Sequence, residues 1–147
     1  DLTELADESM EIVRPLAESR GVKLLLEATE RVMVDADGSQ LARVIRNLLD
    51  NAIRHAPDGS VVLVQVARGD VNVVLRVHDE GTGFPAEFRD RAFEPFTRAD
   101  PARDTRTGTA GLGLSIARGI VNAHDGTVAL GDGPGGDVRI SLPIPSR

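Results

Sequence analysis

The longest regular pattern of apolar positions in the 147-residue chain runs from residue 41 to residue 53. Its apolar side chains recur at spacings of three and four, which places them on one face of an amphipathic helix. They are Leu41, Val44, Ile45, Leu48, Leu49, Ala52 and Ile53. Asp37 and Gln40 have the spacing of a capping box that starts this helix, and Pro57 and Gly59 end it.

The same spacing predicts a helix over residues 2–20 and another over residues 112–123. Pro15 lies inside the first of these, so we expect a kink there or a helix that starts anew. A further short helix is expected over residues 85–93. Residues 97–109 lack clear periodicity and are rich in Arg, Asp and Thr, which is typical of a mobile functional loop.

Short runs of alternating or continuous apolar residues predict the strands of a sheet. The expected strands cover residues 22–28, 32–34, 61–67, 72–78, 127–130 and 138–142. The third and fourth form an expected hairpin, and the last two form a closing hairpin. Helices and strands segregated in this way indicate an α+β fold of two layers, with a largely antiparallel sheet and a single domain over residues 1–147.

Composition narrows the classes of function. The four Phe residues and the lack of Trp and Tyr indicate an aliphatic core. A net charge of -6 argues against a nucleic-acid or anionic-membrane surface, because both require a basic excess, but a few placed cations and a metal can still hold ATP. No Cys is present to form a disulfide or a thiolate zinc site. Without a long apolar run or a signal peptide, the chain is expected to be a soluble cytosolic piece, and its start at Asp1 suggests a fragment.

Polar residues beside the apolar stripe of the central helix predict a metal and phosphate site. Asn47, Asn51 and Arg54 fall within an arc of about 60° on a helix. Magnesium takes one or two oxygen ligands from protein, and Asn51 is the candidate direct ligand, supported by Asn47. Arg54 can offset phosphate charge, and His55 is a candidate nucleotide contact. Alternatively, the asparagines are merely solvated.

Two glycine-bearing segments add candidate nucleotide contacts. Asp79 follows the strand over residues 72–78 on its core-facing side, where a carboxylate needs a hydrogen-bond donor. It can accept from the exocyclic amine of adenine, while Gly81 and Gly83 let the backbone approach the ring. Residues 108–114 precede a helix whose free N–H groups can hold phosphate. The alternatives are an ordinary Asp-Gly turn and a linker ending at a helix cap.

Taken in order, these segments resemble the catalytic ATP-binding domain of bacterial sensor histidine kinases, in the superfamily shared with gyrase, MutL and the ninety-kilodalton chaperones. Residues 47–55 match its N box and residues 79–83 its first glycine box. Residues 93–98 match its F box and residues 108–114 its second glycine box. The resemblance covers nearly the whole chain, and four motifs in register are far more specific than any one.

The resemblance implies a two-layer α/β sandwich of the GHKL (Bergerat) ATPase type, with about three helices on one face of a mixed, mostly antiparallel sheet. It implies that ATP and Mg²⁺ bind, with Mg²⁺ carried by Asn51 and Asn47, and that Asn47 and Arg54 act in catalysis. Asp79 would bind the adenine amine. The remaining nucleotide contacts would be Arg54, His55, Gly81, Gly83, Arg98, Gly108, Gly111, Leu112, Gly113 and Leu114.

The resemblance also implies partners. The γ-phosphoryl group would pass to a His on a separate dimerisation domain, which leads into the helix over residues 2–20, and then to a response regulator. The full-length protein would be a homodimer anchored in the inner membrane, with this fragment monomeric and cytoplasmic. No His here carries the acceptor motif, so the isolated chain is predicted to bind ATP without phosphorylating itself.

Two smaller departures from the family pattern concern the glycines. Gly108-Thr109 stands where the family commonly has Gly-Gly, which would restrict the loop. Gly135-Gly136 stands where Gly-Thr or Gly-Ser is frequent, which would remove a polar contact near the adenine.

Two other functions fit a similar nucleotide site. One is an anti-sigma-factor type serine kinase, which has a similar fold and size but no clear F box, so Phe93 and Phe96 favour the sensor kinase. The other is a nucleotide-binding regulatory module without turnover. Mixing the chain with an acceptor-domain protein distinguishes the three functions. A sensor kinase gives acid-labile phosphohistidine, a serine kinase gives acid-stable phosphoserine, and a regulatory module gives no transfer.

Overall fold

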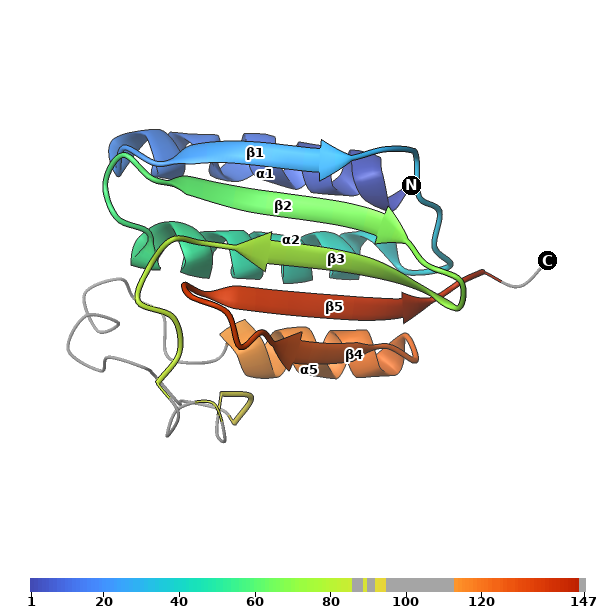
Figure 1. Ribbon diagram of the computed structural model, residues 1–147. Helices are drawn as coiled ribbons and strands as arrows, with labels where there is room; N and C mark the ends of the chain where they lie inside the picture. Colours follow the sequence, from blue (N-terminus) through green and yellow to red (C-terminus); the bar gives the residue numbers. More distant parts are fainter. Residues whose placement is uncertain (86–88, 90–91, 95–112, 146–147) are drawn as a thin grey trace.

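The computed structural model describes residues 1–85, 89, 92–94 and 113–145, which form two layers (Figure 1). One layer is a sheet and the other consists of helices. The helices are α1 (Leu2–Ser19), α2 (Gly38–His55) and α5 (Gly113–Ala123). The strands are β1 (Lys23–Ala28), β2 (Val61–Arg68), β3 (Asn72–His78), β4 (Thr127–Leu130) and β5 (Asp137–Pro143).

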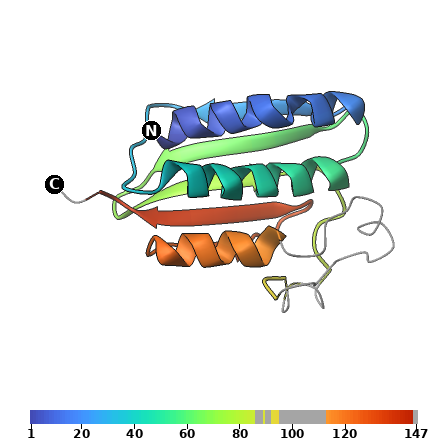
Figure 2. The same ribbon diagram turned by 180° about the vertical axis from the view of Figure 1, so that it is seen from behind.

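The described strands form one five-stranded sheet in the order β1-β2-β3-β5-β4. β1 runs parallel to β2, and the other neighbouring pairs are antiparallel. The last strand of the chain therefore lies between β3 and β4 rather than at an edge. The three helices cover one face of this sheet, as the two opposite views show (Figures 1 and 2). The predicted α+β sandwich with a mixed, mostly antiparallel sheet is confirmed.

The core lies between α2 and the helix-facing side of the sheet. All seven apolar residues of the predicted stripe on α2 are buried. On β3 the alternate residues Val73, Leu75 and Val77 are buried as well, which the period of two predicts for the covered face of a strand. The α2 helix packs between α1 and α5.

The start of α2 is held by two side chains. The Asp37 carboxylate accepts a hydrogen bond from the backbone N–H of Gln40 at 3.1 Å, as predicted for the N-cap. In a capping box the residue 40 side chain would bind the backbone N–H of Asp37. Here His124 accepts from that N–H through Nε2 at 3.0 Å, and its Nδ1 lies 2.8 Å from the carbonyl of Ile120. The imidazole thus links the end of α5 to the start of α2.

One prediction of local structure was wrong, and one of two alternatives at Pro15 is excluded. Residues 32–34 form no strand, because the backbone of Val32 is bound to the start of α1: its carbonyl accepts from Leu2 N–H at 2.8 Å, and its N–H donates to Thr3 Oγ1 at 3.2 Å. Helix α1 runs through Pro15, which excludes a helix that starts anew there. The expected loop over residues 97–109 and most of the expected helix over residues 85–93 lie outside the described residues.

Candidate functional site

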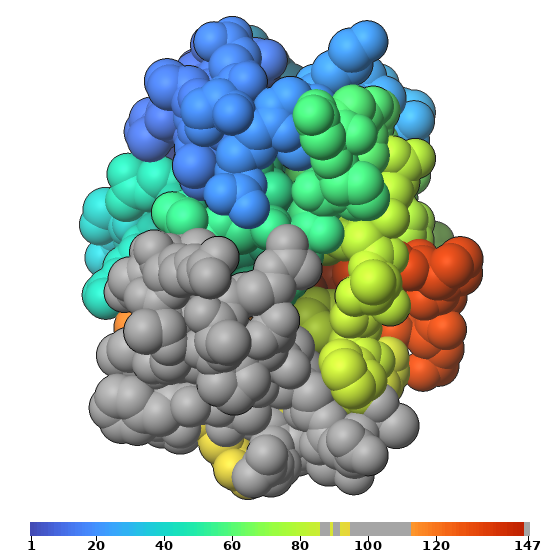
Figure 3. Space-filling model, turned by 90° about the vertical axis from the view of Figure 1, so that its left-hand side faces the viewer, coloured from blue at the N-terminus to red at the C-terminus, as the bar shows by residue number. Residues whose placement is uncertain are grey.

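Four chain segments that carry candidate site residues meet at one end of the sheet, on the left in Figure 1. They are the C-terminal turn of α2, the segment after β3, the turn that leads into β5, and the first turn of α5. The space-filling view onto this end shows the yellow-green segment after β3 between the green segment after α2 and the orange-red C-terminal part of the chain (Figure 3). Segments far apart in the sequence therefore lie together at this end of the sheet.

Asp79 is the buried carboxylate at the centre of this end, with only 5% of the residue exposed. Its Oδ1 accepts hydrogen bonds from the backbone N–H groups of Gly81 at 2.8 Å and of Gly136 at 3.2 Å. Its own N–H donates to the carbonyl of Gly136 at 2.9 Å. The prediction that Asp79 faces the core and needs donors is confirmed. Both hydrogen bonds that the described residues give the carboxylate end at Oδ1.

Glycines allow the backbone to fold closely around Asp79. Gly83 has a φ of 79°, a left-handed conformation that favours glycine. A Cβ on Gly81 would collide with the carbonyl oxygen of His55 and with Oδ1 of Asp79. A Cβ on Gly136 would collide with the Asp79 Oδ2 atom. A side chain at position 136, where the family often has Thr or Ser, would therefore require the Asp79 carboxylate to shift.

The polar side of α2 borders the same end. Asn47, Asn51, Arg54 and His55 are all half-buried, as expected for positions beside the buried stripe. Arg54 Nε lies 3.0 Å from Asp50 Oδ2 in an ion pair one helical turn apart. Arg20 at the end of α1 donates from Nη2 to the carbonyl of Arg54 at 3.1 Å, which ties α1 to the last turn of α2.

Of the candidate residues around the loop before α5 and its first turn, some are described by the structure and others are not. Gly113 is the first residue of α5, and the Leu114 side chain is buried in the core, so that only its backbone can meet a nucleotide. Phe93 of the F box packs against the core, and the guanidinium of Arg118 lies 5.6 Å from the centre of its ring. The other candidate contacts, Arg98, Gly108, Gly111 and Leu112, lie outside the described residues.

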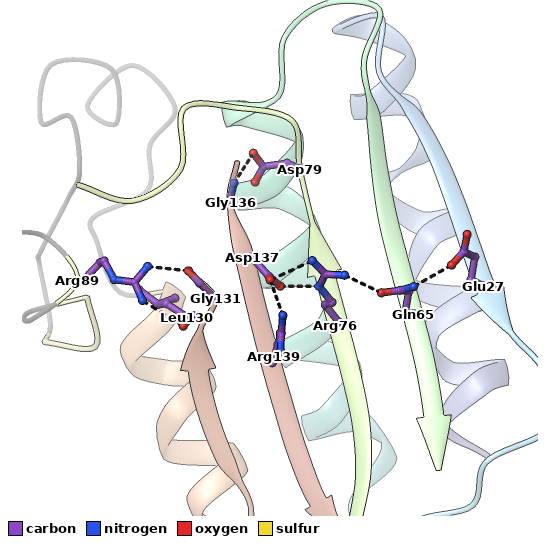
Figure 4. A network of polar contacts seen from close by, with 10 residues as sticks. All are labelled: Glu27, Gln65, Arg76, Asp79, Arg89, Leu130, Gly131, Gly136, Asp137 and Arg139. Atoms are coloured by element: carbon purple, nitrogen blue, oxygen red, sulfur yellow. Dashed lines mark hydrogen bonds and ion pairs between the residues drawn. The ribbon is translucent and has the colours of Figure 1, made fainter. Parts of the chain in front are cut away.

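A charged network on the open face of the sheet was not predicted from the sequence (Figure 4). The Asp137 side chain, 1% exposed, receives Arg76 Nε at 2.8 Å, Arg76 Nη2 at 3.0 Å and Arg139 Nη2 at 3.1 Å. Burial alone would raise the pKa of Asp137, but the two guanidinium groups outweigh burial and lower that pKa below its ordinary value. The alternation of buried and exposed positions places residues 76, 137 and 139 on the side of their strands that faces away from the helices. Only the pairing of β3 with β5, which the sequence does not state, shows that they are neighbours.

The metal chemistry open to the described residues is restricted. Within the described ranges, no group of three or more His, Cys, Asp or Glu residues could hold a metal ion. Among the described helices, none combines the length and the apolar character that a membrane span requires.

The two-layer α+β fold thus carries a buried Asp, close-packed glycines and the amide-bearing side of α2 at one end of its sheet. Residues 36–146 match the family model described as "Histidine kinase-, DNA gyrase B-, and HSP90-like ATPase". The chain belongs to this family, and within it the chain is of the sensor histidine kinase type, as its relatives show.

One such relative is the sensor-like histidine kinase SenX3 of Mycobacterium tuberculosis, 32% identical over 99% of this chain and 36% of SenX3. The mycobacterial sensor histidine kinase MprB has a solved structure with a TM-score of 0.81 and 32% identity, over 97% of this chain and 94% of that one. Full-length ShkA in complex with AMPPNP matches with a TM-score of 0.85 and 25% identity, over 100% of this chain and 31% of that one. The chain spans 24% and 36% of two curated relatives that it matches.

Proposed function

We propose that this domain binds Mg-ATP and transfers its γ-phosphoryl group to a His on a separate dimerisation domain, for relay to a response regulator. The observation that carries this proposal is the Asp79 carboxylate. It is buried, both of its hydrogen bonds from described residues end at Oδ1, and it lies at the sheet end that the amide-bearing turn of α2 borders. That arrangement leaves Oδ2 to accept a hydrogen bond from the exocyclic amine of adenine.

The polar side of α2 supplies the proposed metal and phosphate contacts. Asn51 is the proposed Mg²⁺ ligand, with Asn47 one turn earlier in support, because neutral amide oxygens add no negative charge beside a triphosphate. Arg54 is proposed to offset phosphate charge, and in this structure it is paired with Asp50. When bound, Mg²⁺ supplies charge neutralisation at the phosphate oxygens. Proposed contacts from His55, Gly81, Gly83, Gly113 and the backbone of Leu114 complete the described part, and Arg98, Gly108, Gly111 and Leu112 complete the rest.

In the transfer step, the bond between the γ-phosphorus and the β–γ bridging oxygen breaks and a phosphorus–nitrogen bond forms to the acceptor imidazole. ADP leaves with the bridging oxygen, and the imidazole proton passes to solvent. The protein's contribution is to hold ATP and to neutralise charge, which accounts for most catalysis of phosphoryl transfer. The acceptor domain, the response regulator, a homodimeric full-length protein and its anchoring in the inner membrane all belong to this proposal.

The direct test is to mix the purified chain with γ-labelled ATP, with and without a separately purified dimerisation domain of a sensor histidine kinase. We expect no label on the isolated chain, because none of His55, His78 and His124 lies in an acceptor motif. Label on the acceptor domain should be lost in acid and retained in base, as for phosphohistidine.

Two outcomes would contradict the proposal, and a third would contradict the prediction for the isolated chain. Acid-stable label would indicate a serine kinase, and tight ATP binding without transfer would indicate a regulatory module. Label on the isolated chain would refute the prediction that it cannot phosphorylate itself. Asp79→Asn serves as the matched inactive control, because it should bind ATP weakly and transfer little.

A further inference from the structure

We propose that Asp137, clamped by Arg76 and Arg139 on the open face of the sheet, is a positioning residue that sets the Asp79 carboxylate for adenine recognition through Gly136. This inference rests on the proposed function, since it assumes that Asp79 meets the adenine amine. Asp137 itself touches no nucleotide in this proposal. It acts from the opposite face of the sheet.

The first step is the bond between Gly136 and Asp79. Gly136 accepts from the Asp79 N–H at 2.9 Å and donates its own N–H to Asp79 Oδ1 at 3.2 Å. The Gly136 backbone therefore fixes both the main chain and the carboxylate of Asp79. Because the Gly136 Cα faces Oδ2 so closely that a Cβ there would force the carboxylate to shift, a small movement of Gly136 changes the space and the direction available to Oδ2.

The second step is that Asp137 fixes Gly136. Asp137 is the next residue and the first of β5, and its side chain points away from the helices (Figure 4). Three nitrogen–oxygen contacts of 2.8–3.1 Å join its carboxylate to Arg76 and Arg139. Its carbonyl also accepts from the Gly131 N–H at 2.8 Å, which closes the turn before β5. The buried charge can be held only where both guanidinium groups meet it.

The third step is that Arg76 is itself fixed across the sheet. Its Nη1 donates to Gln65 Oε1 at 3.0 Å, and Gln65 Nε2 donates to Glu27 Oε2 at 2.8 Å. A line of polar contacts thus runs over the open face from β1 to β5 (Figure 4). Arg76 lies three residues before Asp79 on the same strand segment. The ion pair therefore sets the start of β5 against the end of β3, where Gly136 meets Asp79.

The turn before β5 is also held from its other side. Arg89 donates to the carbonyls of Gly131 and Leu130, at 2.6 and 3.2 Å, and its Nη2 lies 2.7 Å from Asp132 Oδ1. The turn cannot follow a displaced Gly136 freely. Loosening of Asp137 should therefore appear as a local change at Asp79 rather than as a general loosening of the turn.

The test compares binding of ATP with binding of purine riboside triphosphate, which lacks only the exocyclic amine. The dissociation constant of the analogue divided by that of ATP reports the contact between the amine and Asp79. Asp137→Asn keeps the shape but removes the charge, and it should reduce this ratio by about three- to tenfold, the value of one hydrogen bond. The affinity for the analogue, which makes no such contact, should stay within about twofold of wild type.

Two reference variants make the result interpretable. Asp70→Asn makes the same chemical change in the exposed turn between β2 and β3, at the other end of the strand pair, and should leave both affinities unchanged. Arg139→Gln removes the more exposed partner of Asp137 and should give a smaller change in the same direction. Thermal unfolding of each variant shows whether it folds, and Arg139→Gln carries the test if Asp137→Asn does not fold.

The outcomes separate this inference from the proposed function. If Asp137→Asn weakens the binding of ATP and of the analogue equally, or changes the binding of neither, Asp137 is only structural and the inference is wrong. Asp79→Asn should abolish the preference for ATP over the analogue. Its Oδ1 would keep the two backbone N–H groups, and its amide nitrogen would face the amine. If the wild type shows no preference for ATP over the analogue, the adenine role of Asp79 fails and both proposals fall.

Discussion

Asp137 carries its charge on a side chain that is 1% exposed, and it can do so because two arginines surround it. A buried charge without partners costs several kcal/mol, and a paired one stays ionised when its partners outweigh that cost. Here the balance favours ionisation, since the pKa of Asp137 is lowered despite burial. The hydrogen bond to Asp137 raises the pKa of Arg76 in turn, so both groups remain charged at neutral pH.

This balance predicts how stability depends on pH. Because the folded-state pKa of Asp137 is lowered, its ionisation stabilises the fold above the ordinary Asp value of about 4, and this contribution is lost as pH falls below it. At pH 7, Asp137→Asn should cost about 1.5–3 kcal/mol in urea unfolding. The difference from wild type should shrink as pH falls below about 4. A difference of equal size in acid would show that charge is not the cause, and Asp70→Asn should show none at either pH.

At Gly136 the structure changes the meaning of a sequence departure. The glycine was expected to remove a polar contact near the adenine, and a side chain there would instead collide with Asp79 Oδ2. The position keeps a polar role through its backbone, which both donates to and accepts from Asp79. Motif comparison reads side chains, so it does not detect a backbone donor of this kind.

Among the elements, α2 combines three tasks along its length. Its start is held by Asp37 and His124, its apolar face forms the centre of the core, and its last turns carry the proposed metal and phosphate contacts. The rigid, packed body of the helix positions the polar side chains at its end. Stability and the site are therefore linked through this one element.

We predict that Leu49→Ala destabilises the domain by about 2–5 kcal/mol, because Leu49 is fully buried and its truncation leaves a cavity. Leu25→Ala is the matched control: Leu25 lies in β1 with half of its surface exposed, and its truncation should cost less than about 0.5 kcal/mol. Urea unfolding of both variants measures the difference. Equal costs at the two positions would place the core elsewhere than between α2 and the sheet.

Hydrophobic spacing predicted most elements because each buries one regular face. Helix α2 and strands β2 and β3 followed this pattern closely. The pattern failed at residues 32–34, where Val32 is buried by docking onto the start of α1 and not by pairing in the sheet. Apolar spacing reports that a residue is buried, but it does not report what its backbone hydrogen-bonds to. The conformation of residues 32–34 is therefore set by tertiary contacts with α1.

At the scale of the whole molecule, strand order brings the site together. β5 inserts between β3 and β4, so Gly136 meets Asp79 across 57 residues of sequence and Asp137 meets Arg76 across 61. Asp79, Gly81 and the polar side of α2 could be predicted because their motifs are local. Gly136, Asp137 and Arg76 could not, since no local pattern states which strands are neighbours. These three residues could be assigned to the site only once the strand order was known.

The helices cover one face of the sheet, and the site lies at its end (Figures 1 and 2). With a net charge of -6, the domain as a whole repels a triphosphate, so the proposed binding depends on local cations, backbone N–H groups and the proposed Mg²⁺. In the proposed function, α2 brings an amide-held Mg²⁺ to an ATP whose adenine reaches Asp79.

Calorimetric titration of ATP with and without Mg²⁺, into the wild-type chain and Asn51→Ala, tests this claim most directly. The wild type should bind ATP more tightly with Mg²⁺, and Asn51→Ala should lose about tenfold of that gain while keeping its metal-free affinity. Asn122→Ala, on the exposed side of α5, is the control and should match wild type. If Asn51→Ala keeps the full gain from Mg²⁺, or if the wild type does not bind ATP, the claim is contradicted.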